Sequence, residues 1–264
     1  MNNQTTPPIL EAKSHDEDSV FKPENLLREA RRQKSLDHGS LPNCCILDPD
    51  GDILNWLQMQ GMSQRSPHWS CYHTALYEFE FDGHRLGIIG QAVGAPFAVL
   101  LAEQLFASSC SLIISMTSAG QISEALKPPC FVLIDKALRD EGTSYHYLAP
   151  STYSLADPGM LALLNGCFDD LNFAVVAGAS WTTDAPYRET QTAIDAARAK
   201  GVLAVEMEAA ALYAFSQAQN KPVLCFAHVT NQMAQNGDDF EKGEADGALD
   251  ALAVISAAYR ALQA

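Results

Sequence analysis

The segment Val205-Glu-Met-Glu-Ala-Ala-Ala-Leu-Tyr213 decides how the rest of this 264-residue chain is interpreted. Its two carboxylates, Glu206 and Glu208, flank a methionine, and an alanine-rich run that favours a helix follows directly. The plainest interpretation is an acidic first helical turn, which the helix macrodipole stabilises. The position allows a second interpretation. The pair stands between a strand and a helix, and ligands of open α/β sheets bind at the carboxyl ends of the strands.

The sequence around this segment alternates between short apolar runs and helical stretches from about residue 43 onward. The apolar runs predict strands over 43–47, 74–81, 85–90, 111–116, 130–135, 173–179 and 223–229. The amphipathic stretches predict helices over 51–59, 96–107, 159–169, 187–199, 207–219 and 245–262. Alternation of this kind is typical of a sheet that helices cover on both faces. We therefore expect one α/β domain over 41–264, with a mostly parallel, mixed central sheet flanked by helices on both faces.

Residues 1–40 are expected to form a polar N-terminal extension with one helix over 23–35, where Pro23 stands near the start. The extension either packs against a partner subunit or is a solvated leader. It holds six of the 17 Lys and Arg residues of the chain. Any phosphate site in the main domain must therefore draw on few cations.

Charge and composition exclude several classes of protein. A net charge of −15 disfavours a broad electrostatic grip on nucleic acid or anionic lipid. The sequence contains no apolar run long enough to span a membrane and no secretory signal pattern. The seven cysteines lie mostly in apolar runs, as in proteins of a reducing compartment, and no Cys or His spacing suggests a metal site. We expect a cytoplasmic protein with no metal, no membrane and no nucleic-acid partner.

Small and hydrogen-bonding residues follow most of the predicted strands. They occupy the segments 48–52, 90–96, 117–120, 180–184, 206–208 and 228–231. Because the carboxyl ends of parallel strands share one edge of a sheet, these segments predict a ligand pocket there.

Several of these segments resemble those of the nucleoside phosphorylase superfamily, which includes uridine phosphorylase, hexameric purine nucleoside phosphorylase and methylthioadenosine nucleosidase. The run VEMEAA is similar to the signature of that family. GQAVGAP at 90–96, IISMTSAG at 113–120 and TDAPY at 183–187 are similar to other family segments in the same order. The resemblance covers about 43–262. It implies the phosphorylase-type fold and cleavage of the N-glycosidic bond of a nucleoside-like substrate.

The resemblance also implies roles at the sugar end of the pocket. Glu208 matches the carboxylate that accepts hydrogen bonds from the ribose hydroxyls, and an ionised carboxylate can accept from both. Met207 matches the methionine that packs under the ribose. Glu206 either orders the helix start or contacts the ligand. Gly94 and Ser118 lie in the turns that face the sugar and the nucleophile.

At the base end, the resemblance implies that Asp184 and Tyr187 lie beside the base, with Arg188 as a candidate to read it. Asp184 either orders its loop or contacts the substrate. Asn231 stands where purine-cleaving relatives have an aspartate that protonates the base. An amide cannot deliver a proton, although it can hydrogen-bond to a carbonyl or N–H group. The sequence therefore favours a pyrimidine, a 6-oxopurine or an unusual base over adenine, with Asn231 as a catalytic candidate.

The phosphate-binding arginines of the family are missing from this sequence. Ile53, Tyr72 or His73, and Ser115 stand at the three places where the resemblance implies arginine. Three charge-assisted contacts to phosphate are therefore lost, which favours hydrolysis over phosphorolysis.

Two features of the sequence bear on the nucleophile. If water is the nucleophile, Asp50 or Asp52 is the candidate base that activates it. The alternative is that this aspartate cluster is only a solvated turn that caps a helix. Arg65, Arg85 or an N-terminal arginine of a partner subunit are the alternative sources of a phosphate grip.

Other functions remain open beside hydrolysis. The first is a phosphate-dependent uridine or 6-oxopurine phosphorylase, with phosphate as co-substrate and no other cofactor. The second is a nucleoside-binding member of the family without turnover, and the third is an unrelated α/β binding protein. The resemblance also implies a homo-oligomer, which is a dimer, a trimer or a hexamer.

Overall fold

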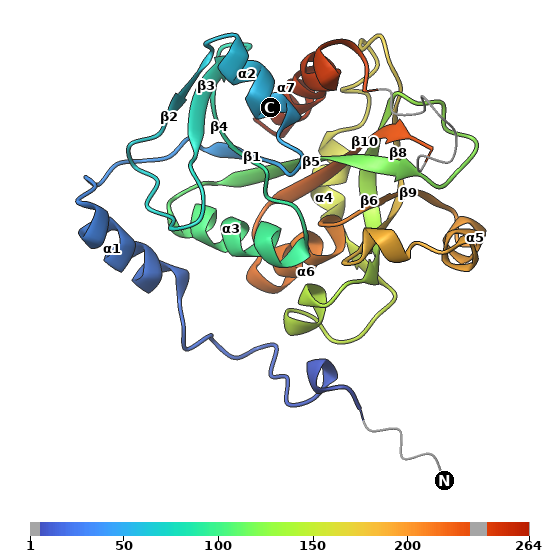
Figure 1. The fold of residues 1–264 in the computed structure, drawn as a ribbon, viewed down its shortest axis with the longest axis horizontal. Coiled ribbons are helices and arrows are strands. Elements are labelled where there is room, and N and C mark those ends of the chain that lie inside the picture. The colour runs from blue at the N-terminus through green and yellow to red at the C-terminus, as the bar shows by residue number, and fades with distance from the viewer. Residues whose placement is uncertain (1–5, 233–241, 264) are drawn as a thin grey trace.

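A single mixed sheet organises the protein (Figure 1). The computed structural model describes residues 6–232 and 242–263, and ten strands lie within them. The strands are β1 (Cys44–Asp48), β2 (Ser63–Arg65), β3 (Tyr77–Phe81), β4 (His84–Gly90), β5 (Leu112–Gln121), β6 (Cys130–Asp140), β7 (Tyr153–Leu155), β8 (Val175–Thr183), β9 (Val202–Glu206) and β10 (Val223–Asn231). Their order in the sheet is β10-β6-β8-β9-β5-β1-β4-β3-β2, with β7 paired to β6.

Helices connect these strands. The α-helices in the described part of the chain are α1 (Pro23–Lys34), α2 (Asp52–Met59), α3 (Ala95–Ala107), α4 (Pro158–Leu163), α5 (Gln191–Ala199), α6 (Ala209–Gln219) and α7 (Ala248–Gln263). Short 3₁₀ turns are η1 (Pro8–Leu10), η2 (Thr143–His146), η3 (Pro186–Arg188) and η4 (Glu244–Gly247). None of these helices is long and apolar enough to cross a bilayer.

Strand β5 is the hub of the sheet. It pairs in parallel with β1 and β10 and antiparallel with β9, so that β5, β10, β6, β8 and β9 close into a ring. The register aligns Gly120 of β5 with Val205 of β9 and with Asn231 of β10. Among the described strands, five pairings are parallel and five antiparallel. The ends of β5, β9 and β10 therefore meet at one place.

The helices form layers on both faces of the sheet, as Figure 1 shows. Helices α3 and α6 pack over one face, whereas α2, α4 and α7 pack over the other, and α5 covers β8 and β9. Strands β1 and β10 lie between the layers and are buried along their whole length. Their continuous apolar sequences are those expected of strands covered on both faces. The predicted α/β class with a mixed central sheet is confirmed.

Several bounds differ from the predicted ones for physical reasons. Strand β5 continues to Gln121, because small polar residues that suggested a turn pair with β9 and β10. Helix α4 ends at Leu163 instead of near 169, and a glycine with φ of +75°, Gly166, follows in the turn. Helix α5 begins at Gln191 instead of 187, because the Thr190 side chain caps it by accepting from the Ala193 amide.

Three strands were not among the predicted ranges. Strands β2 and β7 have three residues each and β9 has five, too few for an alternating pattern to stand out. At the N-terminus, α1 packs Leu27 and Ala30 toward α3. The division of the chain at residue 40 stays a prediction.

Candidate active site

A pocket of about 160 Å³ lies where β1, β5, β8 and β9 end. Its wall contains Asp50 from the turn after β1, Ser118 from β5, and Glu206, Met207 and Glu208 from the junction of β9 and α6. The register of β5 with β9 brings these segments together across 85 or more residues of sequence. The structure thus assembles five of the residues that the sequence singled out.

Glu206 is held on both carboxylate oxygens. Oε1 accepts hydrogen bonds from the hydroxyls of Ser180 (2.9 Å) and Thr182 (2.5 Å), and Oε2 accepts from the amides of Glu208 and Ala209 (both 2.7 Å). Only 3% of the residue is exposed. Burial raises the pKa of Glu206, while these donors act in the opposite direction. This geometry matches the structural alternative for Glu206, because the carboxylate caps α6 and ties it to β8.

Glu208 faces the pocket from the position that precedes α6. Its Oε1 accepts from the Gly94 amide at 2.7 Å, and its Oε2 accepts from the Met207 amide at 3.3 Å. Gly94 has φ of +97° at the start of α3, a conformation that glycine adopts without strain. Burial, followed by the negative charge of Glu206, raises the pKa of Glu208 to about 8. Glu208 therefore occupies the anion-binding end of α3 itself.

The aspartate turn after β1 contains three different environments. Asp48 is buried and accepts from the amides of Leu54 (2.9 Å) and Gly51 (3.2 Å), which anchors the start of α2. Burial raises the pKa of Asp48 to about 7. Asp52 forms an ion pair with Lys242 at 2.5 Å and lies outside the pocket wall. Asp50 is exposed, lines the pocket and accepts from the Ser118 amide at 2.7 Å.

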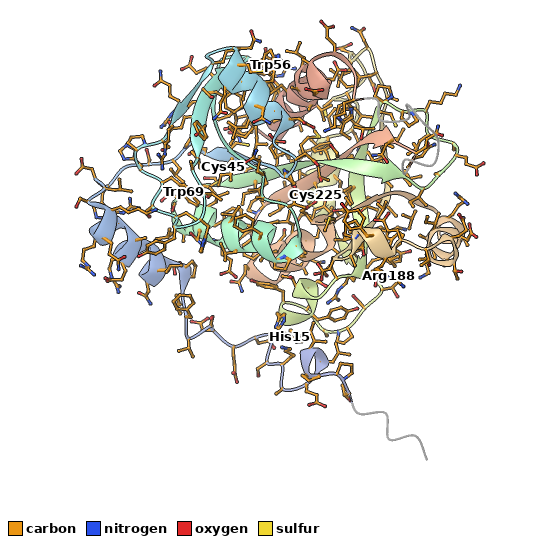
Figure 2. The ribbon with its side chains drawn as sticks, in the orientation of Figure 1. His15, Cys45, Trp56, Trp69, Arg188 and Cys225 are labelled. Atoms are coloured by element: carbon orange, nitrogen blue, oxygen red, sulfur yellow. The ribbon has the colours of Figure 1, made fainter. Side chains whose placement is uncertain are left out.

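The segment after β8, which the sequence predicts to lie beside the base, is nearer the surface. Asp184 is exposed, and its carboxylate accepts from the Gly142 amide at 2.8 Å. Tyr187 is 98% exposed, and Arg188 lies at the periphery of the molecule (Figure 2). Neither side chain belongs to the pocket wall, which takes Pro186 and Glu189 from the same segment.

Asn231 ends β10 and is buried. Its Nδ2 donates to Thr230 Oγ1 at 3.2 Å and lies 3.5 Å from the Ala119 carbonyl oxygen. Its register partner, Gly120, lines the pocket. Asn231 is therefore adjacent to the pocket rather than part of its wall.

Sequence reasoning missed Glu189. The predicted helix over 187–199 placed this residue in a first helical turn, whereas the chain breaks between η3 and α5 and turns Glu189 toward the pocket. Pro186 and Thr190, a helix breaker and a capping residue, were the available signals for that break. Burial raises the pKa of Glu189 to about 7.

None of the positions where arginine was expected belongs to the pocket wall. Ile53 and Ser115 are buried, at 2% and 1% exposure, and Tyr72 hydrogen-bonds to Gln33 on α1. The alternative cations do not reach the pocket wall either: Arg65 is exposed on β2, and Arg85 pairs with Glu78. Within the described residues, no group of three His, Cys, Asp or Glu side chains could hold a metal ion.

Comparisons with known proteins identify the family of the chain. The family model of the phosphorylase superfamily matches residues 63–261. Guanosine phosphorylase of Halorubrum lacusprofundi is 26% identical over 137 residues, which are 52% of this chain and 57% of that protein. Uridine phosphorylase of Thermococcus kodakarensis is 23% identical over 217 residues, which cover 71% and 78% of the two chains.

A solved structure shares the fold. Uridine phosphorylase of Vibrio fischeri ES114 superimposes with a TM-score of 0.71 at 17% identity, covering 85% of this chain and 93% of that one. The chain spans about three fifths of the length of several curated relatives. The family match covers well over half of the chain, and the chain therefore belongs to the phosphorylase superfamily.

Proposed function

We propose that this protein cleaves the N-glycosidic bond of a nucleoside with water as the nucleophile. One observation carries the proposal. The pocket wall contains four carboxylates, Asp50, Glu189, Glu206 and Glu208, and none of its described residues is Lys, Arg or His. A phosphate dianion would find no counter-charge among these residues, whereas a neutral water molecule needs none.

The described part of the chain brings no Lys, Arg or His to the pocket wall. The undescribed stretches 1–5 and 233–241 contain no Lys, Arg or His. The Gly94 amide, which a phosphate could otherwise use at the start of α3, already donates to Glu208. Pro96, in the first turn of α3, has no N–H to offer. A helix terminus contributes only about 0.3–1 kcal/mol to anion binding, which does not replace three arginines.

Glu208 would hold the ribose. Hydroxyl groups that donate to its carboxylate favour the ionised form, so substrate binding should lower the raised pKa of Glu208. The ionised carboxylate then stabilises the positive charge that develops on the sugar as the C–N bond breaks. Glu206 supports this role because its carboxylate fixes the start of α6 and the backbone of Glu208.

Asp50 would activate the water. It is the aspartate of the turn that lines the pocket, and the Ser118 amide orients its carboxylate. In the proposed step, Asp50 accepts a proton as the water oxygen bonds to the anomeric carbon, and the electron pair of the C–N bond leaves with the base. Asp52 is the weaker candidate, because Lys242 neutralises it outside the pocket wall.

Glu189 would face the leaving base. Its half-buried carboxylate accepts hydrogen bonds, and adjacent N–H groups such as those of guanine suit a carboxylate acceptor. The name of one relative, guanosine phosphorylase, supports a 6-oxopurine. Asn231, one register position from the pocket, is the second candidate to contact the base.

The test is base release from guanosine, inosine, uridine and adenosine in phosphate-free buffer, followed by titration with phosphate. We expect release without phosphate and little acceleration on its addition, with guanosine or inosine preferred. The relatives' names favour phosphorolysis as the second candidate. Release that requires phosphate would support that candidate, and tight binding without release would indicate a nucleoside-binding member.

A further inference from the structure

The N-terminal segment 6–22, which we call the strap, crosses the outside of the molecule before it enters α1 (Figure 1). Most of its side chains are exposed, and Val20 is fully so. The partly covered residues of the strap are Ile9, Lys13 and His15. Each of the three meets the loop 142–147, which contains η2.

The contacts of the strap with this loop are specific. Nε2 of His15 lies 3.2 Å from the Tyr145 carbonyl oxygen, and Lys13 Nζ lies 2.9 Å from Nδ1 of His146. A Cβ on Gly142 would stand 3.2 Å from Cδ1 of Ile9. Figure 2 shows His15 at this junction. The strap thus touches the body at the loop and at α1.

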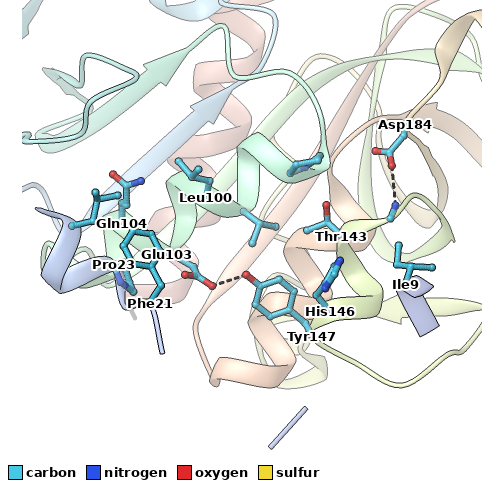
Figure 3. Close-up of a pocket in the computed structure, with 14 residues that line it drawn as sticks. Ile9, Phe21, Pro23, Leu100, Glu103, Gln104, Thr143, His146, Tyr147 and Asp184 are labelled. Atoms are coloured by element: carbon cyan, nitrogen blue, oxygen red, sulfur yellow. Dashed lines mark hydrogen bonds between the residues drawn. The ribbon is translucent and has the colours of Figure 1, made fainter. Parts of the chain in front are cut away.

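Between these two contacts the strap packs loosely. A cavity of about 600 Å³ separates it from α3, with Phe21, Leu100, Glu103 and Tyr147 in its wall (Figure 3). The strap can therefore be altered at one contact without loss of the central core.

The loop transmits this contact because it is held as a unit. Arg139, which is 5% exposed, donates to Ser144 Oγ, to the Ala149 carbonyl and to Ser151 Oγ, each at 2.8 Å. The Glu141 carboxylate accepts from the amides of Thr143 (2.6 Å) and Ser144 (3.0 Å). These hydrogen bonds tie the residues of the loop together in one network.

The loop meets the base side of the pocket at Gly142. The Gly142 amide donates to Asp184 Oδ2 at 2.8 Å, and Figure 3 shows this bond. Asp184 stands two residues before Pro186 and five before Glu189, both in the pocket wall. Ile9 Cδ1 and Asp184 Oδ2 both lie next to Gly142, within 3.2 and 3.6 Å of the position that a Cβ there would take.

We infer that Ile9 and His15 are positioning residues for the nucleoside, because they hold the base-side wall in place through Gly142 and Asp184. The inference rests on the proposed function. It assigns the strap a role in substrate affinity rather than in the chemical step, since none of its residues lines the pocket described above.

Gly142→Ala tests the relay directly. The backbone of Gly142, with φ of −90°, accepts alanine, and the added methyl would press on Ile9 and stand 3.6 Å from Asp184 Oδ2. We expect KM for the preferred nucleoside to rise about three- to tenfold with kcat changed less than about twofold, as for one weakened hydrogen bond. Ile9→Val removes the crowded Cδ1. The double variant Gly142→Ala with Ile9→Val should therefore recover most of the affinity that Gly142→Ala loses.

Two further variants and a second readout complete the test. His15→Ala should raise KM in the same direction, and Val20→Ser, at the fully exposed strap residue, should leave it unchanged. Amide hydrogen exchange over 184–189 should speed up in Gly142→Ala and His15→Ala. Unchanged KM and unchanged exchange in those two variants would overturn the inference. If the wild-type protein releases no base, the proposed function fails, while the exchange data still decide whether the strap holds the wall.

Discussion

At the proposed sugar end of the pocket, Glu206 and Glu208 are 3% and 1% exposed and are held by donors from β8, α6 and the start of α3. At the proposed base end, Asp184, Tyr187 and Arg188 lie at the surface outside the pocket wall, and Asp184 accepts a hydrogen bond from a loop that the strap contacts. The two ends thus differ in what keeps them in place. Core packing fixes the sugar end, whereas contacts between surface segments fix the base end. We expect substitutions at the sugar end to change rate and stability, and those at the base end to change selectivity.

The largest expected effect follows from Glu208→Ala. Base release should fall about 10²- to 10³-fold or more, because the variant loses the charge that stabilises the sugar cation. Glu208→Gln keeps the shape of the side chain and should lose nearly as much activity. Circular dichroism and the thermal midpoint establish that each variant is folded. Near-normal release by either folded variant would remove the sugar end from the mechanism.

Asp50→Asn should rank second and separates the two aspartates of the turn. We expect kcat to fall about 10²-fold, at the low end of what the loss of a general base costs. Asp52→Asn is the matched control: it breaks the ion pair with Lys242 and should change kcat by less than about tenfold, since partly exposed pairs contribute about 1 kcal/mol or less. The reverse ranking would assign the water to Asp52.

Sequence reasoning named most of the carboxylates in the pocket wall and missed Glu189, and the difference lies in how far apart in the sequence the deciding contacts are. Glu206, Met207 and Glu208 lie in one short motif, and the β5–β9 register places them next to Ser118. The orientation of Glu189 depends on where α5 begins, which a capping threonine decides against a continuous helical pattern. The link from Ile9 through Gly142 to Asp184 joins residues more than 130 positions apart, and no periodicity encodes it.

Glu189→Gln is expected to have a smaller effect, confined to the choice of base. Replacing the carboxylate with an amide keeps the size but offers both a donor and an acceptor. We expect kcat/KM for guanosine to fall about tenfold or more, with a smaller change for uridine. Equal losses on every nucleoside would mean that Glu189 does not read the base.

Asn231→Asp should shift preference toward purines protonated on the base.

The last expected effect is on stability against pH rather than on activity. Burial raises the folded-state pKa of Glu208 to about 8 and that of Asp48 to about 7, above their ordinary values of 4.5 and 3.8. The folded state therefore binds these protons more tightly than the unfolded state, and the free energy of unfolding should decline as pH rises from about 4 to about 8. Urea unfolding across this range measures the slope. Glu208→Gln should flatten its upper part, and an unchanged slope would contradict the raised pKa.

The nucleophile is the central claim, and product identity tests it most directly. The wild-type protein is supplied with its preferred nucleoside in water that contains saturating phosphate, and the sugar product is identified by ³¹P and ¹H nuclear magnetic resonance. The pocket wall carries four carboxylates and no cation among its described residues. We therefore predict free ribose and no sugar phosphate. Ribose 1-phosphate as the main product would contradict the account.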